Sequence, residues 1–299
     1  MKESIKGKIK KIYEEKYKLL LLIPCFILML ALAQIGTQYT MTGDFVNKGI
    51  SLKGGSTITI NKFDSITVNE LKSSLTEQFP KADINVRTIT SAGKVVSIAV
   101  DSDAQEKEEI DNLVSVIENK AGLKKGDYNV ETMGSSLGDS FFKQTMFALL
   151  IAFLLMGIVV LIYFRSFVPS IAVMLAAFSD IVVTLAVFNL TGIKLSTAGV
   201  AAFLMLIGYS VDTDIVLSTR VLKRKDGTVM DRIYGSISTG MTMTLTTLVA
   251  VSITLIFVES EVIKQIMVVL FIGLLVDMVM TWIQNVGILR YYLEKKTKA

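Results

Sequence analysis

Long hydrophobic runs recur along this chain, and each is close to the length that crosses a lipid bilayer. A helix needs about 20 apolar residues to span the hydrocarbon core. Six segments meet this requirement; three of them are uncharged, and the other three carry aspartate as their only charged residue. They are residues 19–43, 144–164, 167–190, 195–219, 233–258 and 265–289. The pattern predicts an α-helical integral membrane protein with six transmembrane helices, the last five forming a bundle over residues 144–292.

The segment between the first two runs, residues 44–143, is too polar for the bilayer. Its patterns predict strand, helix, two strands, helix and strand, the order of a ferredoxin-like βαββαβ domain. Thr67 and Glu70 form the capping box that starts the first helix, and Gly122 ends the second. The predicted strands are 56–60, 82–89, 95–101 and 128–132, and the predicted helices are 67–79 and 103–121.

The composition agrees with a membrane protein. Hydrophobic residues make up 52% of the chain and charged residues 19%, against about 25% charged in soluble proteins. The chain has no histidine, which excludes histidine-based acid–base chemistry and histidine-ligated metals. The single cysteine, Cys25, cannot form a disulfide framework or a thiolate metal site. We expect no enzymatic activity, no cofactor, no metal and no nucleic-acid partner.

The distribution of lysine and arginine predicts the orientation in the cell membrane. Positive residues crowd the N-terminal tail (residues 1–18), the 220–232 loop and the C-terminal tail (residues 290–299), whereas the short loops on the other face hold only Lys194 and Lys264. Because positive residues stay on the cytoplasmic side, both termini are expected to be cytoplasmic and residues 44–143 extracytoplasmic.

The beginning of the chain allows other interpretations. Ala31-Leu32-Ala33 is similar to a signal-peptide cleavage site, but the apolar run continues past it and five more spans follow, so we expect an uncleaved span. Ile5, Ile9 and Ile12 are at helical spacing among lysines, as in an interfacial helix. A disordered basic tail explains the same residues.

Four aspartates inside the predicted spans are the candidate functional residues. Each costs about 2.5–3.5 kcal/mol near a helix centre, and no lysine or arginine occurs inside the six runs. We therefore expect protonated or hydrated carboxyl groups, which either couple to ion movement or join helices through hydrogen bonds. They are Asp180, Asp212, Asp214 and Asp277.

Helix geometry separates two of these aspartates. Residues two apart are about 200° apart around a helix, so Asp212 and Asp214 face opposite sides. Asp212 shares its face with Gly208, a small residue that favours close helix packing. We therefore expect Asp212 to point inward and Asp214 to lie nearer a hydrated mouth.

Small residues also recur along the fifth span. Ser236, Gly240 and Thr244 are four residues apart and predict a tightly packed helix face. A hydroxyl-lined ion path is the alternative interpretation. Lys53-Gly54-Gly55-Ser56 lacks the spacing of a phosphate-binding loop, so these glycines predict a turn.

Several strings together resemble the SecD/SecF family of protein-export membrane proteins, in its archaeal form. Residues 208–214 resemble the fourth helix of SecF-type members, and Phe178-Ser179-Asp180 matches the acidic position of their third helix. Residues 48–55, which include Gly49, Gly54 and Gly55, are similar to the Gly-Ile-Asp-Phe-x-Gly-Gly signature after the first span. The resemblance extends over nearly the whole chain.

The resemblance implies membership of the resistance–nodulation–division superfamily, whose transporters have twelve spans built from two halves. A six-span chain is then one half, and the implied partner is SecD. The implied role is to assist the SecY translocation channel in exporting unfolded polypeptide, which bacteria drive with the proton gradient. The other hypotheses are a small-molecule or lipid exporter half of the same superfamily, and a structural subunit without ion flux.

The sequence departs from the bacterial members in three places. Bacterial SecF-type chains have Asn-Asp where this chain has Asp212-Thr213, so Thr213 occupies the bacterial acid position. Thr239 replaces an arginine of the bacterial fifth helix, and Asp277 is an additional acid. The bacterial proton path therefore does not transfer residue by residue.

Overall fold

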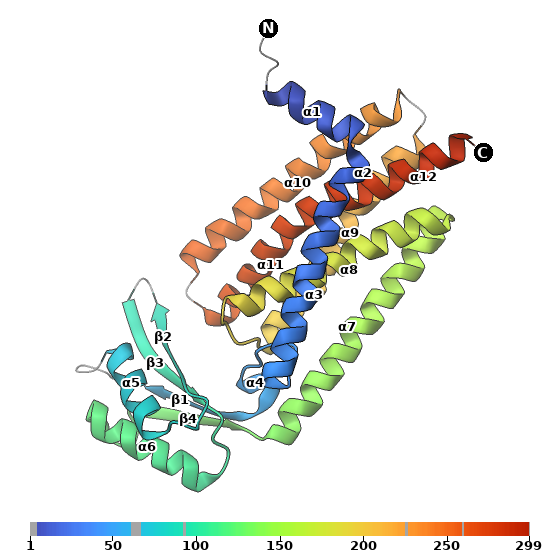
Figure 1. Cartoon of the computed structure of the whole chain (residues 1–299). Coiled ribbons are helices and arrows are strands. Elements are labelled where there is room, and N and C mark those ends of the chain that lie inside the picture. Colours follow the sequence, from blue (N-terminus) through green and yellow to red (C-terminus); the bar gives the residue numbers. More distant parts are fainter. Residues whose placement is uncertain (1–4, 61–66, 92–93, 225–226, 259, 299) are drawn as a thin grey trace.

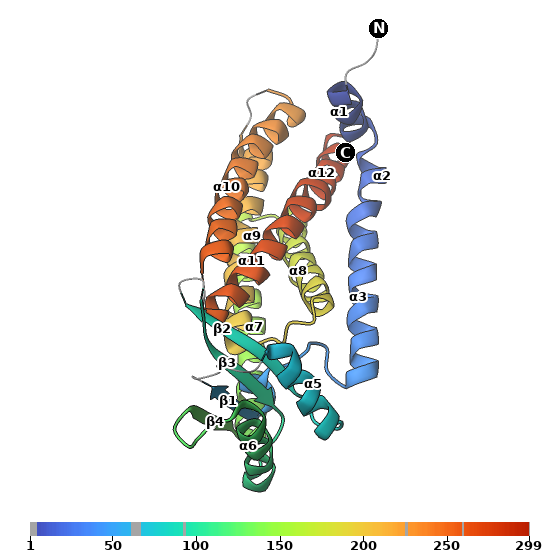
Figure 2. The same cartoon turned by 90° about the vertical axis from the view of Figure 1, so that its left-hand side faces the viewer.

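The fold consists of a long helical bundle with a small α+β domain at one end (Figure 1). The structure is a computed structural model that describes the 299-residue chain except residues 1–4, 61–66, 92–93, 225–226, 259 and 299. Helix α1 (Ile5–Glu15) and the end of helix α12 (Val286–Lys298) both lie at the end of the bundle opposite to the sheet (Figures 1 and 2).

Six helical stretches in the described part are long and apolar enough to cross a membrane. This agrees with the six runs of the sequence. The stretches are α2–α3 (Tyr17–Leu20 and Leu22–Thr42), α7 (Ser135–Phe164), α8 (Phe167–Leu190), α9 (Thr197–Lys223), α10 (Val229–Phe257) and the continuous α11–η1–α12 (Glu261–Val279, Met280–Asn285 and Val286–Lys298).

Several helices extend beyond the predicted apolar runs. The second long helix begins at Ser135 rather than 144, because its first turns are polar yet still helical. Helix α10 begins at Val229 rather than 233, where Thr228 and Asp231 form a capping box. The last stretch contains a π-helix, η1, which the apolar pattern did not indicate. In the N-terminal tail, Ile5–Glu15 forms helix α1.

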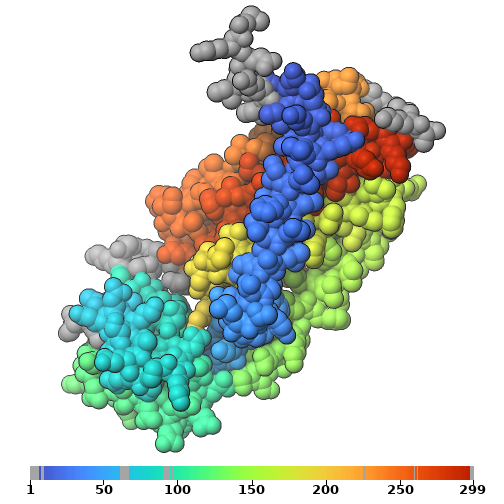
Figure 3. Space-filling model, viewed as in Figure 1, coloured from blue at the N-terminus to red at the C-terminus, as the bar shows by residue number. Residues whose placement is uncertain are grey.

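Helices α8 and α9 form the centre of the bundle. In the most apolar 18-residue stretch of each helix, 61% of α8 and 56% of α9 is buried, against 11% of α2–α3 and 11% of α7. Helix α11 packs against α8, α9 and α10, whereas α3 lies along one outer face, where Figure 3 shows it as a continuous blue ridge. Side chains that are shielded from both lipid and water therefore lie mainly on α8, α9 and α11.

The small domain follows the predicted order of elements. Strands β1 (Gly55–Ile60), β2 (Asn85–Ser91), β3 (Lys94–Ser102) and β4 (Tyr128–Met133) form an antiparallel sheet in the order β2-β3-β1-β4. Helices α5 (Val68–Gln78) and α6 (Lys107–Ala121) cover one face. Ile58, Ile98 and Val100 point into the core beneath these helices. In the described part of the small domain, α5 and α6 leave the other face of the sheet uncovered.

The predicted helix signals of this domain are confirmed. Thr67 accepts a hydrogen bond from the Glu70 backbone, and the Glu70 carboxylate accepts one from the Thr67 backbone. This backbone donor lowers the pKa of the Glu70 carboxyl group below its ordinary value. Gly122 adopts the left-handed conformation that ends α6. The predicted hairpin tip at residues 92–93 lies outside the described residues.

Candidate functional site

Three of the four predicted aspartates meet inside the helical bundle. Asp180 comes from α8, Asp214 from α9 and Asp277 from α11, and none is more than 1% exposed. We call these three carboxyl groups, with the polar side chains that contact them, the acidic cluster. Because these helices form the centre of the bundle, the cluster is shielded from lipid on all sides.

Hydroxyl and amide groups connect the acidic cluster. The Thr281 hydroxyl lies 2.9 Å from Asp277 Oδ1 and 3.0 Å from Asp214 Oδ1, so one hydroxyl bridges two carboxyl groups. Asn285 Nδ2 donates to Asp214 Oδ1 at 2.6 Å, and the Ser210 hydroxyl donates to Asp180 Oδ2 at 2.5 Å. The first set of bonds joins α9 to η1, and the Ser210–Asp180 bond joins α9 to α8.

Both Thr281 and Asn285 belong to η1, the π-helical segment Met280–Asn285. Single π-helical turns inside α-helices occur frequently at functional sites. Neither residue was singled out from the sequence, because a threonine and an asparagine in an apolar run resemble ordinary helix-facing polar residues. Their place beside Asp214 becomes visible only when α9 and η1 are in contact.

The cluster has fewer hydrogen-bond donors than acceptors. Asp180 Oδ1, Asp214 Oδ2 and Asn285 Oδ1 are buried without a hydrogen-bond partner. The ion pairs of the described chain all lie elsewhere, so no lysine or arginine offsets the carboxyl groups. Buried polar atoms are normally paired, and three unpaired carboxylates would repel one another. The cluster is neutral only if it takes up protons or another cation.

The expectation for the direction of Asp212 and Asp214 was wrong. The two side chains do face opposite sides of α9, but Asp214 is fully buried and Asp212 is exposed. Helices α8, α10 and α11 pack on the Asp214 side, and helix geometry alone does not indicate which side they occupy. Asp214 therefore replaces Asp212 as the inward-facing group.

The small residues predicted to pack between helices also differ, because some are buried and one is exposed. Ser236, Gly240 and Thr244 are buried, and a Cβ added at Gly240 would lie 2.3 Å from the Trp282 ring. Gly208 is instead exposed, and an added Cβ would meet nothing within 4 Å. Among the described residues Gly208 therefore packs against no other helix, which corrects that part of the prediction.

The glycines of the predicted outer motif hold the small domain against the bundle. The Gly49 N–H donates to the Leu195 carbonyl at 2.7 Å, between α8 and α9. Gly54 and Gly55 have φ angles of +88° and +136°. A Cβ would lie 2.5 Å from Ser135 Cα at Gly54 and 2.2 Å from the Ser102 carbonyl oxygen at Gly55. Both positions thus require glycine.

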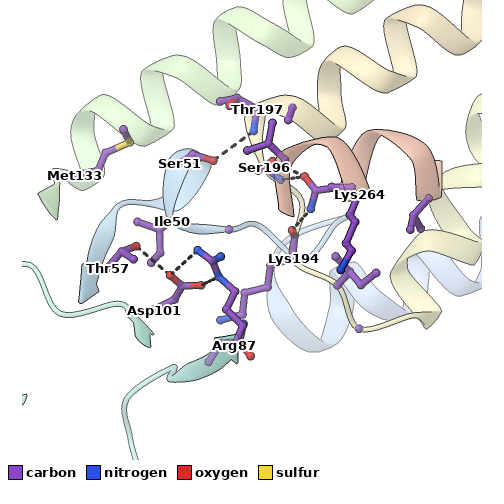
Figure 4. A pocket seen from close by; sticks show the side chains of 18 of the residues that line it. Ile50, Ser51, Thr57, Arg87, Asp101, Met133, Lys194, Ser196, Thr197 and Lys264 are labelled. Carbon is purple, nitrogen blue, oxygen red and sulfur yellow. Dashed lines mark hydrogen bonds and ion pairs between the residues drawn. The ribbon is translucent and has the colours of Figure 1, made fainter. Parts of the chain in front are cut away.

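A cleft of about 940 Å³ separates the open face of the sheet from the ends of the helices beneath it (Figure 4). We call it the outer cleft. On the sheet side Asp101 accepts hydrogen bonds from Thr57 and Arg87. On the bundle side the loop between α8 and α9 contributes Lys194 and Ser196. No local pattern in the sequence indicates this cleft, because its lining comes from segments far apart in the chain.

Gln265, at the start of α11, holds the loop between α8 and α9. Its Nε2 donates to the Lys194 carbonyl at 2.6 Å, and its Oε1 accepts from the Ser196 backbone at 3.0 Å and from the Ser196 hydroxyl. The same loop contacts the small domain, because Lys194 Nζ lies 2.8 Å from Asp83 Oδ1. Gln265 therefore connects the helix of Asp277 to the small domain.

Replacing Gln265 with alanine should loosen this loop without disturbing the acidic cluster. Losing the hydrogen bonds of Gln265 should cost about 1–3 kcal/mol locally. Amide hydrogen exchange at Ser196 and Gly49 should accelerate accordingly. Lys264→Ala is the matched control, because the Lys264 side chain makes no hydrogen bond with the described residues. Unchanged exchange in Gln265→Ala would show that the loop is held by other contacts.

Comparison with known proteins decides the family. Residues 114–295 match the family model described as "Protein export membrane protein SecD/SecF, C-terminal". The chain belongs to the SecD/SecF family. "Protein-export membrane protein SecF" of Pyrococcus furiosus is 38% identical, over 98% of this chain and 96% of that protein. The protein of the same name from Methanothermobacter thermautotrophicus is 39% identical, over 95% of each chain.

A solved structure of the SecD/SecF family has a related fold. The crystal structure of SecDF, described as a translocon-associated membrane protein, from Thermus thermophilus, superposes with a TM-score of 0.72 at 20% identity. The match covers 93% of this chain but only 38% of the SecDF chain. This chain therefore corresponds in fold to a part of that larger protein.

Proposed function

We propose that this chain is an auxiliary subunit of the Sec protein-export machinery and acts together with SecD. In this role it assists the SecY channel in moving unfolded polypeptide across the cell membrane, and it is not an enzyme. The names of the relatives and their nearly full-length similarity support the proposal. The limited coverage of the SecDF chain supports the need for a second membrane half.

The exposed side of α9 is the observation on which the proposal depends most. Ala201, Met205, Gly208 and Asp212 follow one another at helical spacing along this side, and all four are exposed. Asp212 lies close to the middle of the helix, where a charged residue facing lipid costs about 2.5–3.5 kcal/mol. A second membrane protein against this stripe removes that cost, and the small residues allow its helix to approach closely.

Replacing Gly208 with phenylalanine should separate the chain from SecD. Gly208 is exposed and an added Cβ meets nothing within 4 Å, so folding should be unaffected, whereas a helix packed on the stripe would be pushed away. Purification of a tagged chain from native membranes should recover SecD with the wild type and lose it with Gly208→Phe. Ile162→Phe on the exposed side of α7 is the control. SecD retained by Gly208→Phe would contradict the assigned interface.

The proposed topology places the small domain as a ferredoxin-like unit outside the cytoplasm and both termini inside. The lysine and arginine distribution supports this orientation. The location of the two chain ends on the same end of the bundle agrees with an even number of spans. In this arrangement the outer cleft lies on the side where exported polypeptide emerges.

We further propose that the acidic cluster couples ion movement, with protons as the ion, to motion of the outer domain. The missing donors around Asp180 and Asp214 support uptake of positive charge. Helices α8 and α11 lead from the cluster to the loop that contacts the outer domain. In this proposal Asp212 contributes to the ion coupling from the side of α9 that faces SecD. In the alternative, a structural subunit, the same acids act only as hydrogen-bond partners between helices.

A further inference from the structure

The π-helical turn η1 changes the hydrogen bonding of one backbone carbonyl, that of Trp282. In a regular α-helix each N–H donates to the carbonyl four residues earlier, so the Val286 N–H would donate to Trp282. Here the Val286 N–H donates to the Thr281 and Ile283 carbonyls. The Trp282 carbonyl accepts a hydrogen bond from the Tyr13 hydroxyl at 2.8 Å. A side chain of the N-terminal helix α1 therefore enters the hydrogen-bond ladder of η1, which is a known cause of helix distortion.

Trp282 lies between the two residues of η1 that contact Asp214. The Thr281 hydroxyl and Asn285 Nδ2 lie 3.0 Å and 2.6 Å from Asp214 Oδ1. A π-helical turn closes with i→i+5 hydrogen bonds and is therefore wider than an α-helical turn. The directions of Thr281 and Asn285 relative to each other depend on this width. Whatever stabilises the backbone at Trp282 thus helps to place both side chains on Asp214.

The docking of α1 on the bundle brings the Tyr13 hydroxyl to this position. Arg290 on α12 donates to the Tyr13 and Glu14 carbonyls, each at 2.8 Å. These carbonyls belong to the last turn of α1, where the helix dipole favours a cation. The Tyr234 hydroxyl on α10 donates to Glu14 Oε1 at 3.0 Å. Helix α1 is thereby fixed to both α10 and α12.

Tyr13 is suited to act as a permanent donor. Its ring packs against the buried apolar group that includes Ile233, Trp282 and Val286. Burial raises the pKa of the Tyr13 hydroxyl above its ordinary value, so the hydroxyl keeps its proton. On α10, Gly240 lies against the Trp282 ring. The backbone of Trp282 is therefore held by α1, while its ring is held by α10.

We propose that Tyr13 is a positioning residue for the acidic cluster and that the docking of α1 sets the geometry of this cluster, an inference that rests on the proposed role of the cluster in ion coupling. The Tyr13 hydroxyl stabilises the π-helical turn, and the turn places Thr281 and Asn285 on Asp214. Release of α1 removes this donor and lets η1 change its turn, so Asn285 loses its direction toward Asp214. A helix that precedes the six spans thereby controls a site buried among them.

The single tryptophan of the chain provides a specific measurement. Labelling with ¹³C at the tryptophan carbonyl and ¹⁵N at isoleucine marks one peptide bond alone, that between Trp282 and Ile283. Solid-state NMR of the full chain in nanodiscs then reports the environment of this carbonyl. Tyr13→Phe removes the hydroxyl but keeps the ring. It should move the carbonyl signal, and the gradient-dependent part of export in native membrane vesicles should fall at least about twofold.

Two further variants separate this role from general loosening of α1. Tyr234→Phe is the matched control, because it removes one tyrosine hydroxyl bond from the same contact region without touching η1. It should keep the wild-type carbonyl signal and export rate. Arg290→Met keeps an apolar stem but cannot donate to the α1 carbonyls, so it should move the signal as Tyr13→Phe does. A wild-type signal in Tyr13→Phe or in Arg290→Met, or an equal displacement in Tyr234→Phe, overturns the proposal.

Export by Asp214→Asn distinguishes failure of this inference from failure of ion coupling. If Asp214→Asn abolishes the gradient-dependent part of export, and Tyr13→Phe moves the carbonyl signal without reducing export, the positioning role fails and ion coupling stands. If neither variant reduces export, ion coupling fails. The hold of Tyr13 on η1 is then decided by the carbonyl signal alone.

Discussion

Replacing Asp214 with asparagine is expected to reduce gradient-dependent export to the background level while leaving the fold and the association with SecD intact. Asparagine keeps the size of the side chain and an oxygen that accepts from Thr281 and Asn285. It cannot take up or release a proton. The measurement is the rate of preprotein transport in native membrane vesicles with and without a proton gradient, together with SecD recovery.

Asp139→Asn is the matched control for this substitution, because the Asp139 carboxyl group is exposed near the start of α7. It should export at the wild-type rate. Asp180→Asn should resemble Asp214→Asn, since Asp180 contributes a carboxyl group to the same cluster. Normal gradient-dependent export by both cluster variants would favour the structural subunit, in which these acids only join helices.

Replacing Gly55 with alanine is expected to have the largest effect on stability. The φ angle of +136° is strained for any residue with a Cβ, and the added atom would lie 2.2 Å from the Ser102 carbonyl oxygen. Because this contact is with backbone, strand β3 has to move. Strain and overlap together should destabilise the small domain by about 3 kcal/mol or more. Hydrogen exchange of the β1 and β3 amides measures this loss.

Gly122→Ala separates the two causes. Gly122 also has a positive φ, +65°, but an added Cβ meets nothing within 4 Å. Its cost should be only that of the left-handed conformation, about 1–2 kcal/mol. Equal losses at Gly55 and Gly122 would show that the close approach to Ser102 contributes nothing.

Much of the architecture was predictable because its signals are local. The capping box of Thr67 and Glu70 and the helix end at Gly122 depend only on neighbouring residues, and both are confirmed. The glycine motif indicated a turn. Only the structure explains why Gly54 and Gly55 must be glycine, because the reason lies in distant backbone at Ser135 and Ser102.

The functional groups were less predictable. Three of the four aspartates meet in one cluster, which composition alone could not show. No local signal indicates a role for Thr281, Asn285 or Gln265, because nothing distinguishes a threonine or an amide in an apolar run until its partner is known. The outer cleft has no local signal at all, since its two walls come from separate parts of the chain.

The sequence by itself determined which stretches can cross a membrane and that Asp212 and Asp214 point in opposite directions. Both follow from local physics: hydrocarbon excludes charge, and each residue turns a helix by a constant angle. Only the tertiary structure decided that Asp214 is inside and that Asp212 and Gly208 are outside. That choice depends on which side of α9 is covered by α8, α10 and α11, and an angle within one helix does not contain this information.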